Sequence, residues 1–89
     1  MKKPDYLVQI DPTKRFFPSS WKTAYWRLNG GLSKKGYQCP GCLKRFKGSE
    51  GFLRLQADHK KAYALGGSSI WENMQLLCNS CNNKKSYIY

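Results

Sequence analysis

At 89 residues, the chain is long enough for one domain and too short for a second hydrophobic core. A core this small gives modest stability, so a metal ion or covalent cross-links should reinforce it. The 16 Lys and Arg against 5 Asp and Glu give a formal net charge of +11, which favours a nucleic-acid partner over a merely solvated basic surface. No transmembrane run occurs, and no amphipathic helix segregates the basic residues as membrane binding would require.

Residues 1–18 are predicted to form an irregular basic N-terminal arm, because three prolines interrupt them. Within the arm, Tyr6 to Ile10 fits either a short strand or an extended segment. The apolar residues 7–10 are too few for a signal peptide and precede Asp11-Pro12. We therefore expect a protein that is not secreted and works in the cytoplasm.

A helix is predicted over residues 21–28, with Ser19 or Ser20 as its N-cap and Asn29-Gly30-Gly31 as its stop. Its apolar residues recur at helical spacing, and we interpret them as a packing face because the domain has little else to bury. Base stacking by these aromatic residues is the alternative. The residues that share this face are Trp21, Tyr25 and Leu28.

The rest of the chain alternates short apolar segments with polar, glycine-containing turns, which predicts a small α+β fold. Gly41 is interpreted as relieving the backbone between two cysteines of a tight hairpin. The alternation in the segment that ends at Asp58 is typical of a strand with one wet face. The predicted elements are a hairpin over residues 37–46, a loop over 47–51, a strand over 52–58, a loop over 64–69, a strand over 74–77 and a helix over 81–87.

Four cysteines form two Cys-x-x-Cys pairs, Cys39 with Cys42 and Cys78 with Cys81. Two such pairs can supply four thiolates to one Zn²⁺ in a closed structural site. Disulfides are one alternative, but nothing at the N-terminus indicates secretion. A redox pair is another, and it requires a thioredoxin-like alternation of strands and helices that a chain this small cannot hold. We favour zinc.

The second half of the chain carries an ordered set of motifs. A Cys-Pro-x-Cys is followed by Asp58-His59, a Gly-Gly loop, Trp-Glu-Asn-Met-Gln-Leu-Leu-Cys, and Cys-Asn-x-x-Lys ending at Lys85. In combination these motifs resemble the HNH endonuclease family and its ββα-metal finger, over about half the chain. The family's last motif position is His, and here it is Asn82, a substitution also found in CRISPR effector nucleases and in small phage and restriction enzymes.

The resemblance implies a ββα-metal (His-Me finger) nuclease fold stapled by the four-cysteine zinc site, with an N-terminal helix and a basic arm. We divide the chain into an arm over residues 1–18 and a nuclease domain over 19–89, whose core motif spans 37–86. The implied activity is hydrolysis of DNA, by nicking or double-strand cleavage, that leaves a 5′-phosphate and a 3′-hydroxyl. A homodimer would favour double-strand cleavage.

Residue chemistry suits these roles. His59 is the only histidine, and its ordinary pKa near neutrality makes it the natural general base for a water molecule. Asp58 can ligate a divalent metal ion, and the resemblance makes the amide oxygen of Asn82 the second ligand, with Asn83 as the competitor. Two oxygen ligands favour Mg²⁺ or Mn²⁺. By resemblance, Asn73 holds the imidazole or its loop through a hydrogen bond.

Basic residues near these motifs and in the arm are predicted to contact DNA phosphates, mostly without reading sequence. Two non-catalytic alternatives share the same cysteines and charge. One is a zinc-stapled DNA-binding module, and the other is an RNA-binding or ribosome-associated zinc ribbon. Neither requires the coincidence of the aspartate, the histidine and the two asparagines. The predicted phosphate contacts are Lys14, Arg15, Lys60, Lys84 and Lys85.

Overall fold

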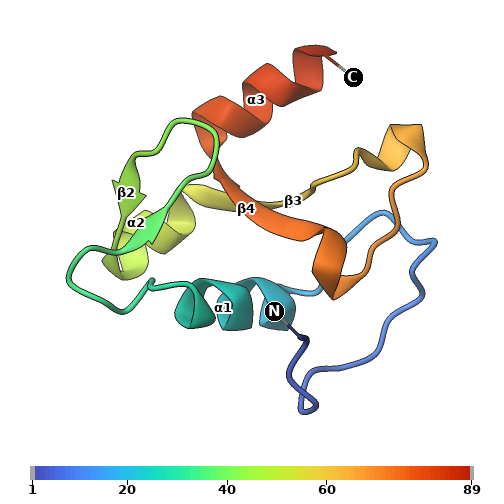
Figure 1. The fold of residues 1–89 in the computed structure, drawn as a ribbon, viewed down its shortest axis with the longest axis horizontal. Coiled ribbons are helices and arrows are strands. Elements are labelled where there is room, and N and C mark those ends of the chain that lie inside the picture. The colour runs from blue at the N-terminus through green and yellow to red at the C-terminus, as the bar shows by residue number, and fades with distance from the viewer. Residues whose placement is uncertain (1, 89) are drawn as a thin grey trace.

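The computed structural model describes residues 2–88, with side chains described through residue 85. Its elements follow the predicted order of an N-terminal helix, a cysteine hairpin, two further strands and a closing helix, with one additional short helix and two 3₁₀ turns (Figure 1). The elements are α1 Ser19–Leu28, β1 Tyr37–Gln38, β2 Arg45–Phe46, α2 Gly48–Leu53, β3 Leu55–His59, η1 Tyr63–Leu65, η2 Trp71–Asn73, β4 Met74–Cys78 and α3 Asn79–Ile88.

The antiparallel hairpin of β3 and β4 is the centre of the fold. Leu55 pairs with Cys78 at one end and His59 with Met74 at the other. Helix α1 contacts β4, while α3 contacts both strands, and Figure 1 shows the two helices on opposite sides of the hairpin. The end of β3, with Asp58 and His59, therefore lies beside α3.

Strand β4 belongs to both hydrophobic clusters of the core. The first cluster joins it to the cysteine hairpin, where Tyr37 Oη donates to the carbonyl oxygen of Leu76 at 2.8 Å. The second joins it to α1 and to Leu7 of the arm. The first cluster contains Trp26, Tyr37, Cys39, Leu55, Leu76, Leu77 and Cys78, and the second contains Leu7, Trp21, Ala24, Trp71 and Met74.

Helix α1 differs from its prediction in its N-cap and in the residues that it buries. It begins at Ser19, and Pro18 is its N-cap, so neither serine caps it. Proline suits the start of a helix because the missing amide hydrogen would have had no helical acceptor. Leu28 was predicted to be buried and is exposed, whereas Trp26 is buried against Phe52 of α2.

Residues 47–51 were predicted to form a loop, and this prediction is wrong because most of them belong to α2. The two glycines of this segment indicated a turn, but Gly51 serves close packing: a Cβ there would lie 2.7 Å from the carbonyl carbon of Phe46. Because α2 runs to Leu53, the following strand begins at Leu55 and not at Phe52. The hairpin over 37–46 and the strand over 74–77 are confirmed, and the closing helix begins two residues early, at Asn79.

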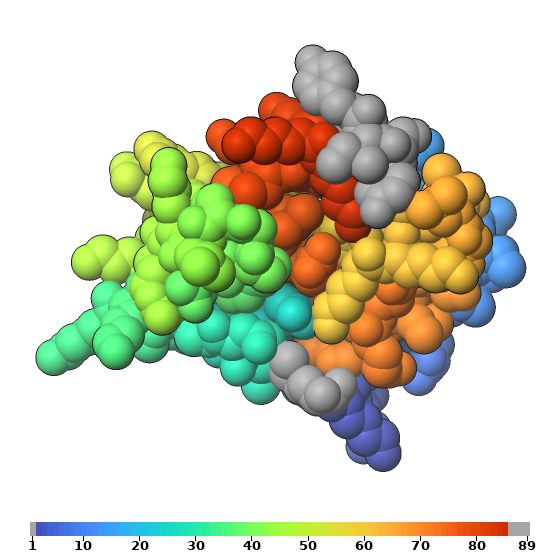
Figure 2. Space-filling model, turned by 45° about the horizontal axis from the view of Figure 1, so that its top comes forward, coloured from blue at the N-terminus to red at the C-terminus, as the bar shows by residue number. Residues whose placement is uncertain are grey.

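The N-terminal arm is irregular, as predicted, and residues 6–10 form no strand. It is fixed to the core by the buried side chain of Leu7 and by Trp21 Nε1, which donates to the carbonyl oxygen of Val8 at 2.9 Å. Figure 2 shows the arm, in blue, at the same edge of the molecule as residues 60–68, in yellow to orange. None of the helices in the described part of the chain combines the length and apolar character that crossing a bilayer requires.

Replacing Leu76 by Ala should lower the free energy of unfolding by about 2–5 kcal/mol, because its side chain is fully buried in β4 and a cavity would remain. Urea unfolding at a fixed metal concentration measures the change. Leu53→Ala is the matched control, since Leu53 is 74% exposed and its loss should cost less than about 0.5 kcal/mol. Equal effects of the two substitutions would contradict the assignment of the core.

Candidate active site and metal centres

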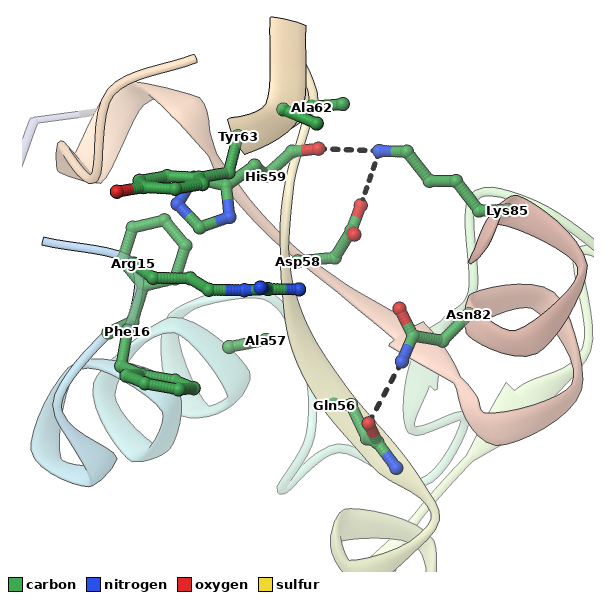
Figure 3. Close-up of a pocket in the computed structure, with 12 residues that line it drawn as sticks. Arg15, Phe16, Gln56, Ala57, Asp58, His59, Ala62, Tyr63, Asn82 and Lys85 are labelled. Carbon is green, nitrogen blue, oxygen red and sulfur yellow. Dashed lines mark hydrogen bonds and ion pairs between the residues drawn. The ribbon is translucent and has the colours of Figure 1, made fainter. Parts of the chain in front are cut away.

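The last two residues of β3, Asp58 and His59, lie in a pocket of about 510 Å³. Figure 3 shows them between two walls, one from α3 and one from the arm and η1. The pairing of β3 with β4 fixes the backbone under both side chains. The lining residues are Arg15, Phe16, Phe17, Gln56, Ala57, Asp58, His59, Ala62, Tyr63, Ala64, Asn82 and Lys85.

The Asp58 carboxylate is held by two side chains on one of its oxygens. Lys85 Nζ lies 2.6 Å from Oδ2, and Gln75 Nε2 donates to the same atom at 3.0 Å. Lys85 Nζ also donates to the carbonyl oxygen of His59 (Figure 3). Both contacts use Oδ2, so the described residues leave the second carboxylate oxygen without a hydrogen bond.

Asn82 lies on α3 and faces β3. Its amide nitrogen donates to Gln56 Oε1 at 2.9 Å, and Gln56 Nε2 in turn donates to Asn79 Oδ1 at 2.8 Å. With its nitrogen used in this way, Asn82 turns its amide oxygen towards Asp58 (Figure 3). Asn83, the competing ligand, is exposed and does not line the pocket. The geometry thus brings oxygen atoms of Asp58 and Asn82 to one side of the pocket, a donor set that suits a hard divalent cation.

The His59 ring has a defined tautomer. Its Nε2 lies 2.8 Å from Oγ of Ser69, and that hydroxyl donates its single hydrogen to the carbonyl oxygen of Lys14. The hydroxyl can therefore only accept from the ring, which places a proton on Nε2 and leaves Nδ1 with its lone pair. Ser69 is 1% exposed, and its amide donates to the carbonyl oxygen of Pro12 at 2.8 Å, so the acceptor is firmly held.

Burial lowers the pKa of His59 below its ordinary value of 6.5. The Asp58 carboxylate raises this pKa, while the Lys85 and Arg15 charges lower it. The ring also packs against Phe17, with ring centroids 4.5 Å apart. The net result is an imidazole that is neutral at neutral pH and able to accept a proton.

Asn73 was predicted to hold the imidazole or its loop, and it contacts the loop. Its Oδ1 accepts from the amide of Lys61 at 2.8 Å, and its Nδ2 donates to the carbonyl oxygens of Lys61 and Ser68. Its own carbonyl oxygen accepts from the amide of Lys60 at 2.7 Å. These four hydrogen bonds hold together the two ends of the loop between His59 and Ser69. They thereby keep the Ser69 hydroxyl beside the imidazole of His59.

The four cysteines converge on one point. Their sulfur atoms all lie within 4.8 Å of one another, and the Sγ atoms of Cys42 and Cys78 are 3.7 Å apart. Gly41 was interpreted as relieving the backbone, but Leu43 takes the left-handed conformation in this turn. Gly41 instead provides space, because a Cβ there would lie 2.8 Å from Cys81 Sγ. This cluster could hold a metal ion.

The protonation of the cluster also suits a metal ion. Burial raises the pKa of Cys39, but hydrogen bonds from the backbone amides of Cys78, Cys42 and Gly41 outweigh it and lower this pKa to about 6. Burial and hydrogen bonds with the other three thiols raise the pKa of Cys81 to about 12. The cluster thus favours one thiolate and disfavours the deprotonation of further thiols. A bound cation would remove this electrostatic penalty.

The predicted phosphate contacts lie in different settings. Arg15 and Lys85 line the pocket, whereas Lys14, Lys60 and Lys84 are exposed and do not line it. The structure also adds site residues that the sequence analysis missed, namely Gln56, Ser69, Gln75, Phe17 and Tyr63. The only sequence signal for any of them is the pair of phenylalanines that directly follows Lys14-Arg15 in the arm.

A family model described as HNH endonuclease matches residues 39–87, which is more than half of the chain. The chain belongs to the HNH endonuclease family. The matched region contains the four cysteines and both strands that carry the pocket, and the fold agrees with the ββα-metal arrangement of this HNH domain. Comparisons with curated proteins and with solved structures gave no match. Membership indicates a nuclease or DNA-binding function.

Ser69→Ala should allow the neutral His59 ring to adopt both tautomers, because the acceptor of the Nε2 hydrogen is lost. In protein labelled with ¹⁵N-histidine, the single histidine of the chain gives unambiguous ring signals. At a pH where the ring is neutral, the wild type should show a protonated Nε2 and a bare Nδ1, and the variant should show averaged tautomers. Ser68→Ala, at the exposed neighbouring position, should leave the signals unchanged. A wild-type ring protonated on Nδ1 would contradict the assignment.

Proposed function

We propose that this protein is a metal-dependent endonuclease that hydrolyses phosphodiester bonds of DNA. The observation that supports it is the juxtaposition, in one pocket, of the His59 imidazole and the oxygen atoms of Asp58 and Asn82. A DNA-binding module requires none of these three groups to face one another. The net charge of +11 supports the nucleic-acid substrate.

Asp58 and Asn82 would hold a divalent cation, and their oxygen atoms favour Mg²⁺ or Mn²⁺. Such a cation would neutralise charge on the scissile phosphate and on the departing oxygen. Gln56 and Gln75 would orient these two ligands through the hydrogen bonds described above. Asn73 would act through the loop that positions His59.

His59 would act as the general base through Nδ1. A water O–H bond breaks as its proton moves to Nδ1, the water oxygen bonds to phosphorus, and the bond from phosphorus to the 3′-oxygen breaks. The departing 3′-oxygen would take a proton from solvent, and the imidazolium would later release its Nδ1 proton to solvent, so the products would be a 5′-phosphate and a 3′-hydroxyl. The proton on Nε2 stays on that nitrogen and is donated to Ser69 Oγ throughout, and Asp58 would stabilise the imidazolium that forms, because its charge raises the pKa of His59.

The basic residues around the pocket would bind the DNA backbone. Arg15 and Lys85 line the pocket and would contact a phosphate there, and the exposed Lys14, Lys60 and Lys84 would contact phosphates outside it. These contacts would be largely independent of sequence. Assembly into a homodimer stays a prediction.

The four-cysteine cluster would hold a structural Zn²⁺. Thiolates around a tetrahedral zinc ion lie about 3.8 Å apart, given Zn–S bonds of about 2.3 Å. The Sγ separation of 3.7 Å between Cys42 and Cys78 fits this spacing. Because Cys81 directly precedes Asn82, the zinc ion would also fix the position of a catalytic-metal ligand.

A second candidate function is a zinc-stapled DNA-binding module without activity. The observation that favours it is the ion pair of Lys85 with Asp58, which already neutralises the carboxylate that the nuclease would use for its metal ion. The two candidates differ in one measurement, the dependence of plasmid cleavage on added Mg²⁺ or Mn²⁺. Omitting these ions is preferable to chelation, since a chelator would also remove zinc.

His59→Ala should abolish Mg²⁺-dependent plasmid cleavage, because the described lining of the pocket holds no second imidazole and its carboxylate, Asp58, is engaged by Lys85. Agarose gels measure nicked and linear products, and circular dichroism with zinc analysis measures the fold and the zinc content. Both structural readouts should match the wild type. Leu32→Ala, at an exposed position outside the pocket, is the activity control.

Unchanged cleavage by purified His59→Ala would rule out this residue as the base. Absence of metal-dependent cleavage of both plasmid and single-stranded DNA by the wild type would favour the binding module. Parallel assays on RNA address the zinc-ribbon alternative, which predicts RNA binding with no cleavage of either polymer.

Cys81→Ser should lower zinc content and cleavage together, because the loss of one thiolate frees the first turn of α3 and displaces Asn82. Zinc is measured by atomic absorption and cleavage by the plasmid assay. Ser80→Ala, at the exposed neighbouring position, should change neither quantity. A Cys81→Ser protein that stayed folded and fully active would refute the coupling between the two metal sites.

A further inference from the structure

The wall of the pocket opposite Asp58 and Asn82 comes from outside the strands and α3. Arg15 and Phe16 of the arm and Tyr63 of η1 form it, and Figure 3 shows them facing the α3 wall across the pocket. The family match begins at residue 39, so the arm's part of this wall lies outside the matched region. The two walls have different chemistry: one offers oxygen ligands, the other aromatic faces and a guanidinium.

The two adjacent phenylalanines of the arm have different environments. Phe17 is partly buried and packs between Trp21 and the His59 ring, at centroid distances of 6.1 and 4.5 Å. Phe16 is 80% exposed although it lines the pocket. Its ring therefore adds little to the folding of the domain and presents an apolar face to whatever enters the pocket.

Arg15 is held beside this exposed ring. Its guanidinium lies over the Tyr63 ring at 5.9 Å from the centroid, and Tyr63 Oη donates to the carbonyl oxygen of Thr13 at 3.0 Å. The arm and η1 are thus joined to each other at the pocket. A guanidinium fixed on an aromatic face keeps its charge and its planar set of donors for a phosphate.

We propose that Phe16 and Arg15 form a binding subsite for an unpaired nucleotide beside the scissile phosphate, with the base stacked on Phe16 and a phosphate on Arg15. This subsite rests on the proposed function and specifies its substrate class. Paired bases in a duplex present only their edges to a protein, so an aromatic face in a charged pocket selects bases that are already unstacked. The substrate is therefore single-stranded DNA or DNA with a locally unpaired nucleotide.

The test uses DNA binding without cleavage, in the His59→Ala background and without added Mg²⁺. The probes are a short single-stranded DNA oligonucleotide carrying a fluorescent base analogue that stacking quenches, and a blunt-ended duplex of matched length in which every base is paired. Adding Phe16→Ala should weaken single-strand binding about tenfold and abolish the quenching, and should leave duplex binding unchanged. Adding Phe16→Trp should preserve both properties, because indole also stacks.

Tyr6→Ala is the matched control, since Tyr6 is 79% exposed on the same arm and does not line the pocket. It should bind both probes like its parent. Arg15→Ala should weaken binding to both probes and reduce the salt dependence, because a phosphate contact is lost. Equal losses of single-strand and duplex binding in Phe16→Ala, or no loss, would overturn the subsite. Cleaved probe in these mixtures would refute His59 as the base without bearing on stacking.

Discussion

The convergence of four sulfur atoms between the cysteine hairpin and the start of α3 is the constraint on which the site depends. Cys78 is the last residue of β4 and Cys81 lies in the first turn of α3, so the cluster fixes the angle at which the helix leaves the strand. Asn82 and Lys85, three positions apart, then lie on the helical face that meets β3. A domain with so small a core has few other means to hold that angle.

The arm is the second anchor of the site, and it acts on the imidazole from the opposite side. Ser69 joins the loop after His59 to two backbone carbonyls of the arm, and Phe17 covers one face of the ring. The surroundings of the imidazole thus come from two parts of the chain with different roles. Residues 39–87 match the family model, and the arm lies outside the matched region.

The sequence predicted those features that depend on local pattern. Asp58 and His59 were placed at a strand end, and the cysteine pairs were placed together, because periodicity and spacing decide both. The sequence did not predict α2. The close approach of Gly51 to Phe46 is a packing contact, and a glycine in the sequence does not distinguish such a contact from a turn. It also missed Ser69, whose bond to Lys14 joins residues 55 positions apart with no pattern between them.

Because Lys85 forms an ion pair with Asp58, a metal ion would compete with the ammonium group for this carboxylate. A metal ion that binds the Oδ2 atom of Asp58 would displace the ammonium group, so its net binding free energy would be the difference between the free energies with which the two cations bind this oxygen. The displaced ammonium then becomes available to a phosphate, on the face of α3 where Asn82 also lies. Metal and polyanion should consequently bind with positive cooperativity, and each should raise the affinity of the protein for the other by the same factor.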